Sequence, residues 1–76
     1  MNEDIRIGSW AWSKEEMLKG SKVINVDMHD NTKLYCYYDK EFNAFVNMYK
    51  NGNFMIYRSV DSALPALDYG WEIYTP

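Results

Sequence analysis

The side chains able to carry covalent chemistry are few in this sequence. Cys36 is its single cysteine and His29 its single histidine. A nucleophilic thiol needs a nearby base or cation to lower its pKa, whereas the neighbours of Cys36 are Tyr35 and Tyr37. We therefore predict a buried, unreactive thiol, no catalytic residue and no enzymatic activity.

Metal ions and phosphate cofactors also lack their usual ligands. One cysteine and one histidine cannot complete a structural zinc site. His29 with Asp27 or Asp30 could contact a cation, although an exposed turn histidine explains the same residues. The four glycines are isolated and do not form a phosphate-binding loop. We expect neither a metal ion nor a cofactor.

Neighbouring carboxylates are the remaining candidates for acid–base chemistry. They occur at Glu15 and Glu16 and at Asp39 and Glu41. A helix start explains the first pair and a polar turn explains the second, so we assign neither pair a catalytic role.

One group of side chains points to binding rather than catalysis. Aromatic rings alternate along the expected strands and end beside a single cation, which is typical of a stacking site for a base or an aromatic side chain. The candidate binding residues are Tyr35, Tyr37, Tyr49, Phe54 and Arg58. A curled sheet that buries both of its faces is the alternative interpretation of the same residues.

Length and composition limit how such a site is held in place. The chain has 76 residues, which predicts a single domain over 1–76. A core of this size supplies roughly 3–5 kcal/mol unless disulfides, metals or oligomer contacts add to it. One cysteine forms no internal disulfide. Dense packing of the aromatic residues, which make up 17% of the chain, self-association, or both must therefore stabilise the fold.

The charge balance bears on the partner and on location. The formal net charge is −3 and the basic residues form no cluster, which argues against direct nucleic-acid binding. An acidic surface suits a protein partner with a basic, nucleic-acid-binding face. The sequence has no secretion signal and no apolar run of membrane-spanning length, and a lone cysteine suits a reducing compartment. We expect a cytoplasmic protein of the host cell without membrane contacts.

The elements that would position these residues begin with a helix. Ser13 followed by Glu16 has the pattern of a capping box, and Gly20 is a typical stop signal. These signals predict a helix over 14–19. Residues 5–12 alternate in polarity and predict a short strand or an ordered arm before it.

Strands account for most of the remaining chain. The segments with strand composition and alternation are 22–28, 33–38, 44–50, 53–59 and 71–74. Asn51-Gly52 predicts a two-residue type I′ turn, which would place Tyr49 opposite Phe54 and Met48 opposite Met55. One helical turn is expected within 61–67.

The fold class that follows is α+β. We expect a small, twisted, mostly antiparallel sheet of four to five strands with one short N-terminal helix, which could curl into a half-barrel. In the expected hairpin register, one face is more uniformly apolar than the other, and we assign it to the core. Its residues are Ala44, Val46, Met48, Met55 and Tyr57.

Two short segments resemble a known group of proteins. Lys19-Gly20-Ser21-Lys22-Val23 resembles the opening of small bacteriophage proteins, and Gly70-Trp71-Glu72-Ile73-Tyr74 resembles their ending. That group includes anti-defence proteins that inhibit the Thoeris system by sequestering its nucleotide signal. The group has Arg and Trp in or just after the first strand, where this chain reads Val23-Ile24-Asn25-Val26, so no binding residue carries over. The resemblance implies a phage or prophage origin and identifies no ligand.

Three functions are compatible with these observations. The first is a small, non-enzymatic, phage-type binding protein that inhibits or modulates a host protein, such as a CRISPR effector or another nucleic-acid-targeting defence protein. The second is a sponge that holds a nucleotide signal in an aromatic pocket. The third is a self-associating structural or accessory domain, and a homo-oligomer is compatible with all three.

Overall fold

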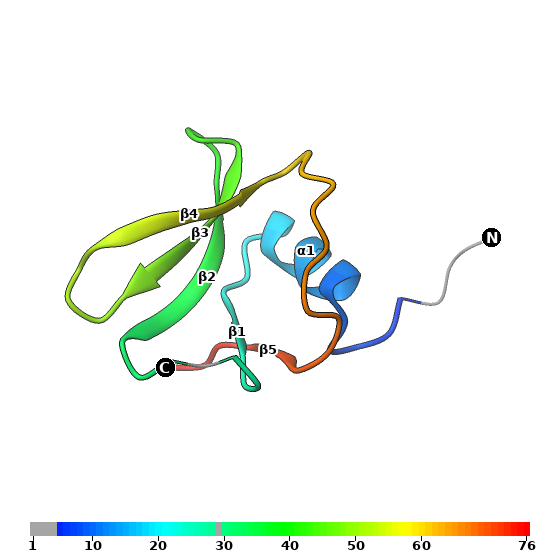
Figure 1. The fold of residues 1–76 in the computed structure, drawn as a ribbon, viewed down its shortest axis with the longest axis horizontal. Coiled ribbons are helices and arrows are strands. Elements are labelled where there is room, and N and C mark those ends of the chain that lie inside the picture. The colour runs from blue at the N-terminus through cyan, green and yellow to red at the C-terminus, as the bar shows by residue number, and fades with distance from the viewer. Residues whose placement is uncertain (1–4, 29) are drawn as a thin grey trace.

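One short helix packs against a five-stranded sheet in the computed structural model, which describes residues 5–28 and 30–76. The elements are α1 (Trp10–Leu18), β1 (Val23–Asn25), β2 (Lys33–Asp39), β3 (Ala44–Tyr49), β4 (Phe54–Ser59) and β5 (Trp71–Ile73). The strands form an open antiparallel sheet of order β4-β3-β2-β1-β5 (Figure 1). The expected α+β class is confirmed, and the cation site suggested at His29 lies outside the described residues.

The last strand does not follow its sequence neighbour in the sheet. β5 pairs with β1, while β4 forms the opposite edge. The loop over 60–70 therefore runs from one edge of the sheet to the other and passes across α1 (Figure 1).

The N-terminus of α1 is assembled partly from residues far along the chain. Ser9 is the N-cap, and its Oγ accepts the N–H of Trp12 at 3.1 Å. The Asp68 carboxylate accepts the N–H of Trp10 at 3.0 Å. It thereby places a negative charge beside the positive end of the helix dipole. The helix accordingly begins at Trp10.

The expected helix start at Ser13 is therefore wrong, as is a strand or extended arm reaching to residue 12. Ser13 lies inside α1, fully buried, and its Oγ donates to the carbonyl of Trp10 at 2.9 Å. Glu16 accepts a hydrogen bond from Ser21 Oγ at 3.2 Å and makes no return bond to a cap. The helix ends at Leu18, one residue before the expected end, and Gly20 acts as the expected stop signal. The N–H of Gly20 bonds to the carbonyl of Met17 at 3.0 Å, as in a Schellman motif.

Asn25 ends β1 earlier than expected. Its Oδ1 accepts the N–H groups of Asp27 and Met28 at 2.9 and 3.0 Å, which turns the chain out of the strand. Its Nδ2 donates to the carbonyl of Tyr69 at 2.8 Å. This buried amide therefore fastens the chain before β5 to the end of β1.

The β3–β4 hairpin closes with a three-residue loop in place of the expected type I′ turn. Tyr49 accepts the N–H of Gly52 at 3.0 Å and donates to the carbonyl of Asn53 at 2.9 Å. Gly52 has a φ of +90° while Asn51 stays out of the left-handed region, which is a type I turn followed by a G1 bulge. The Asn51 side chain accepts the N–H of Asn53 at 2.9 Å, and this Asx-turn bond favours the observed geometry.

The longer loop moves the strand register by one residue from the expected one. Met48 lies opposite Phe54 and Val46 lies opposite Ile56. An irregularity between Phe45 and Val46 leaves Tyr57 as an extra, unpaired residue in β4. Beyond this bulge, Phe45 lies opposite Arg58, which is the pairing that the expected two-residue turn would give. The predicted pairs Tyr49–Phe54 and Met48–Met55 are therefore wrong.

Residues 61–67 form no helical turn and make an irregular loop instead. The guanidinium of Arg58 donates to the carbonyls of Leu64 and Pro65 at 2.6 and 3.1 Å. Proline cannot donate to a helical ladder, and the Arg58 bonds satisfy carbonyl groups in the loop.

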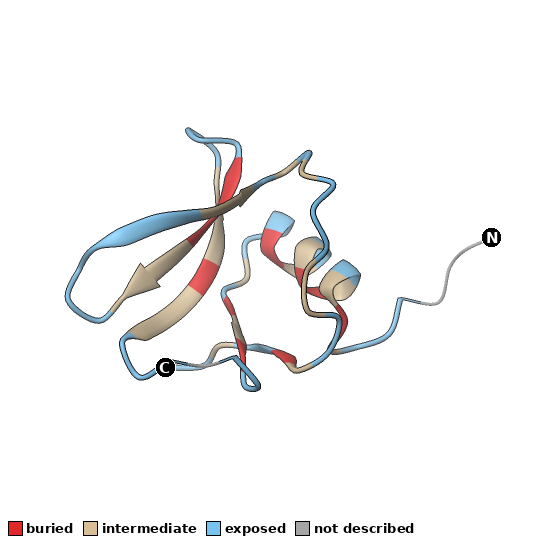
Figure 2. Ribbon diagram, in the orientation of Figure 1, coloured by how far each residue is buried: buried red, intermediate tan, exposed pale blue. Residues whose placement is uncertain are grey.

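The core lies between α1 and one face of the sheet, and aromatic rings dominate it (Figure 2). The ring of Trp10 lies 5.5 Å from that of Phe45, 5.1 Å from that of Trp71 and 5.8 Å from that of Tyr57. The indole N–H of Trp71 donates to the carbonyl of Leu67 at 2.7 Å. Edge-to-face and tilted contacts of this kind add to the stabilisation from burial alone.

The expected core face of the hairpin is only partly correct. Ala44 and Val46 are buried, but they lie on the sheet face opposite α1, and only Tyr57 of the expected set packs against the core cluster. Phe45, which is not in the expected core set, is only 1% exposed, whereas Met55, which is in it, is 62% exposed. The end of the hairpin near α1 is buried on both sides, while its far end projects beyond the helix (Figure 2).

Replacing Gly70 with alanine should destabilise the fold far more than the same change at Gly52. Gly70 has a φ of +83°, and an added Cβ would lie 2.9 Å from Asn25 Oδ1 and closer still to Asp27 Oδ2. Gly52 is the matched control, because its φ is +90° and its Cβ would meet nothing within 4 Å.

Urea unfolding measures the difference. We expect a loss of about 1–2 kcal/mol for Gly52→Ala from the left-handed backbone alone, and at least about 2 kcal/mol more for Gly70→Ala because of the clash. Equal losses for the two variants would contradict the close packing of Gly70 on Asn25.

Candidate functional site

Cross-strand pairing gathers aromatic and apolar side chains on the sheet face that α1 does not cover. Tyr37 lies opposite Val46, which lies opposite Ile56, and Tyr35 lies opposite Met48, which lies opposite Phe54. Residues directly opposite each other in a sheet share a face. We call this surface the open face; its residues are Tyr35, Tyr37, Val46, Met48, Phe54 and Ile56.

A ring from the β2–β3 turn extends the open face. The ring of Phe42 lies 5.8 Å from that of Phe54, and each of these residues is 48% exposed. Ile56 is 52% exposed, while Val46 is fully buried. The open face is therefore a packed apolar layer whose outer rings remain accessible to solvent.

Tyrosines occupy the other end of the open face. The ring of Tyr35 lies 5.9 Å from that of Tyr37 and 5.1 Å from that of Tyr74. Lys22 Nζ lies 4.6 Å from the centre of the Tyr35 ring, a cation–π distance. These rings already accept one cation from the protein itself.

Asp39 adds a negative charge beside these rings. The hydroxyl of Tyr37 donates to Asp39 Oδ2 at 3.3 Å. Desolvation and then the nearby Asp39 carboxylate raise the pKa of Tyr37. The phenol therefore stays neutral around pH 7, and this end of the face carries an acidic charge next to aromatic surface.

The structure brings together only three of the five residues expected to form a binding site. Tyr35, Tyr37 and Phe54 share the open face. Tyr49 alternates with Met48 along β3 and so belongs to the opposite face.

Arg58 is also on the opposite face and has a structural role there. Its guanidinium carbon lies 4.4 Å from the centre of the Tyr57 ring and 5.4 Å from that of Trp10. The bulge at Tyr57 explains this placement, because it turns both Tyr57 and Arg58 toward α1.

The sequence interpretation missed Phe42 and Ile56. Phe42 follows the polar residues Asp39-Lys40-Glu41. A large ring at the end of a polar turn is the signal that could have identified it. Ile56 alternates with Met55 along β4 and so shares the face of Phe54, but its exposure depends on β4 being an edge strand, which no local pattern reveals.

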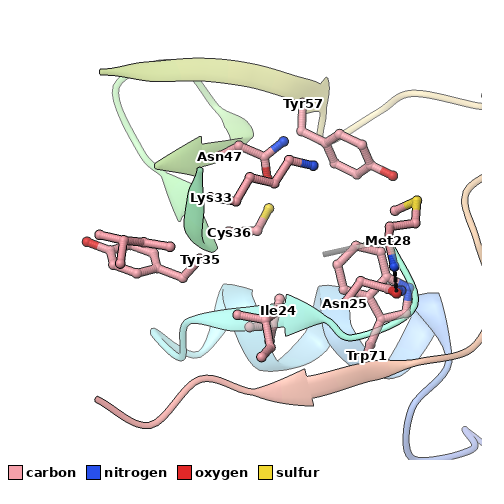
Figure 3. A pocket seen from close by; sticks show the side chains of 11 residues that line it. Ile24, Asn25, Met28, Lys33, Tyr35, Cys36, Asn47, Tyr57 and Trp71 are labelled. Atoms are coloured by element: carbon pink, nitrogen blue, oxygen red, sulfur yellow. Dashed lines mark hydrogen bonds between the residues drawn. The ribbon is translucent and has the colours of Figure 1, made fainter. Parts of the chain in front are cut away.

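A small cavity lies where β1 and β2 diverge. The two strands pair only at Val23 and Cys36, and beyond this pair the side chains of Lys33, Cys36 and Asn47 point toward the gap (Figure 3). Its volume is about 30 Å³, enough for roughly two water molecules. A nucleotide needs a pocket of about 300 Å³ or more, so this cavity does not accommodate one.

The Cys36 thiol is unreactive in this environment. Burial raises the pKa of its thiol from 9.0 to about 12, and the positive charge of Lys33 offsets only part of that effect. In the part of the chain that the structure describes, no three His, Cys, Asp or Glu side chains come together to hold a metal ion.

Comparisons with known proteins identify no relative from which a function could be inferred, so the site is interpreted from its geometry. No family model, curated protein or solved structure matches this chain. Within residues 5–28 and 30–76, no helix has the length and apolar character needed to cross a bilayer. The open face is thus the candidate site, because it is accessible aromatic surface held by a rigid sheet.

The Cys36 thiol should resist alkylation in the folded protein. A pKa of about 12 instead of 9.0 lowers the thiolate fraction near neutral pH about a thousandfold, so iodoacetamide should label Cys36 rapidly only in urea. Because the folded pKa is raised, the stability contribution of the neutral thiol is complete below pH 9 and is lost as the pH rises toward 12.

The stability difference between wild type and Cys36→Ala should therefore shrink above pH 9, by up to about 1.4 kcal/mol per pH unit. Urea unfolding at a series of pH values measures it. Rapid labelling of the native protein, or a difference that does not change with pH, would contradict a buried, neutral thiol.

Proposed function

We propose that this chain is a small, non-enzymatic binding protein that uses the open face to occupy the surface of a protein partner. The observation that carries the proposal is a sheet with one face covered by α1 and the other lined by accessible rings of Phe42 and Phe54. Contiguous exposed apolar surface on a small protein is typical of an interaction site.

The composition of the open face favours a protein partner. Tyrosine and phenylalanine supply large contact area at low conformational-entropy cost, and such residues are enriched at the centres of interfaces. The face offers these rings on strands instead of loops, so little ordering is needed on binding.

The charges favour a partner with arginine or lysine on its surface. The net charge is −3, and Asp39 lies beside the ring of Tyr37. A cationic side chain can stack on a ring of the open face, as Lys22 already does on Tyr35, and pair with a nearby carboxylate. Proteins that bind nucleic acid present such basic surfaces.

The resemblance of the chain's two segments to phage proteins gives this proposal a biological setting. We assign the protein to the cytoplasm of a host cell, where it inhibits or modulates a host defence protein of the nucleic-acid-targeting class. A nucleotide sponge has less support, because the more enclosed cavity, beside Cys36, measures about 30 Å³, while the larger hollow at the tip of the β3–β4 hairpin, about 520 Å³ beside Phe54 and Met55, is open to solvent.

Removal of the exposed rings should abolish partner capture without unfolding the protein. The test variant combines Phe42→Ser with Phe54→Ser. The matched control combines Leu64→Ser with Tyr69→Ser, which removes two apolar side chains that are 69% and 59% exposed and lie in the loop over α1.

Affinity capture from host lysate, followed by cross-linking and mass spectrometry, measures the effect. We expect the affinity for the captured partner to fall at least about 30-fold for the open-face variant, the effect of losing an interface hot spot of about 2 kcal/mol. The control should bind as wild type does. Equal binding by both variants would argue against the open face as the site.

A further inference from the structure

β4 is an edge strand with little protection. The sheet ends at β4 on one side and at β5 on the other. β5 has only three residues, and Gly8 covers part of it by accepting the N–H of Trp71 at 3.1 Å. β4 has six residues, so it offers the longer free edge.

The hairpin geometry identifies the free backbone groups of β4. Tyr49 and Asn53 form a hydrogen-bonded pair next to the turn. In an antiparallel ladder, such pairs alternate with pairs whose backbone groups point away from each other. The N–H and C=O groups of Phe54 and Ile56 therefore point outward, and those of Met55 point toward β3.

The side chains of this edge are apolar. Phe54, Met55 and Ile56 are 48%, 62% and 52% exposed. Natural edge strands are usually protected by outward lysines, prolines or bulges. Here the only charged residue of β4, Arg58, lies over the rings of Trp10 and Tyr57, and the bulge at Tyr57 leaves the residues before it unprotected.

We infer that two copies of this chain pair antiparallel along β4, with Met55 opposite Met55 across a two-fold axis. In this register Phe54 of each copy lies opposite Ile56 of the other, so the outward backbone groups of both residues can exchange hydrogen bonds. On the open face, Phe54 of each copy packs beside Ile56 of the other, a favourable aromatic–aliphatic cross-strand pair, and on the opposite face the two Met55 side chains meet.

Charge complementarity supports a second copy as the occupant of this edge. In this register Lys50, at the β3 side of the turn, is level with Val60 of the other copy, the residue before Asp61. Lys50 and Asp61 are exposed, and neither forms an ion pair among the described residues. The two-fold axis repeats this arrangement, so each end of the paired strands carries a basic residue level with the start of an acidic segment.

The pairing goes beyond the proposed function, because it does not depend on what the open face binds. It would join the two open faces into one continuous surface across a ten-stranded sheet. The contact is small compared with the roughly 800 Å² per partner of a standard interface. The dimer should therefore form reversibly with rising concentration.

Sedimentation velocity over a range of concentrations tests the pairing. We expect wild type to shift from monomer to dimer, and Met55→Lys and Met55→Glu each to weaken the dimer at least about tenfold, because like charges would face each other at the two-fold axis. An equimolar mixture of the two variants should restore the dimer. Leu64→Lys, at an exposed position away from the edge, should behave as wild type.

Circular dichroism and the urea midpoint establish that each variant is folded. A wild type that stays monomeric at every concentration would overturn the inference, as would a dimer that Met55→Lys leaves intact or that Leu64→Lys weakens equally. If wild type stays monomeric and the Met55→Lys variant no longer captures the partner, the β4 edge binds that partner. This result would overturn self-pairing but would leave the proposed function in place.

Discussion

The fold depends on the position of Trp10. Its ring contacts Phe45, Tyr57 and Trp71, and its backbone N–H is held by Asp68. Full burial of one large ring removes about 150–250 Å² from water, worth about 4–6 kcal/mol at ~25 cal/mol per Å², and this is an upper limit for Trp10, which is partly buried. Even a part of that gross gain is comparable with the roughly 3–5 kcal/mol of net stability expected from a core of this size. A single side chain thus joins the helix, the hairpin, the long loop and the last strand.

The same constraint explains why one sheet face stays uncovered. α1 has nine residues, and the aromatic cluster holds it over the face that bears Phe45. Arg58 ties the long loop to this same side through the carbonyls of Leu64 and Pro65. Among the described residues, α1 and the long loop therefore lie on one side of the sheet, and the rings of Phe42 and Phe54 are left at the surface.

The sequence predicted the elements better than their junctions. Alternation located β2 to within one residue, and Asn51-Gly52 located the hairpin, because both signals are local. The helix start was misplaced because its partner, Asp68, is 58 residues away from Trp10. The hairpin register differs from the expected one because Asn-Gly is compatible with both a two-residue type I′ turn and a three-residue loop. The Asx-turn bond of Asn51 favours the three-residue loop. In the candidate site, Tyr35, Tyr37 and Phe54 followed from alternation, whereas Arg58 did not, because a bulge reversed its direction.

Hydroxyl-radical footprinting of the dilute protein tests most directly whether the rings divide into a buried cluster and an accessible face. Phe42 and Tyr37 should be oxidised readily, and Phe45 and Trp71 should be protected until the protein unfolds. Binding of the partner should then protect Phe42 and Tyr37 without altering the protected pair. Oxidation of Phe45 and Trp71 in the native protein, with Phe42 and Tyr37 protected, would place the core on the opposite side of the sheet and contradict this account.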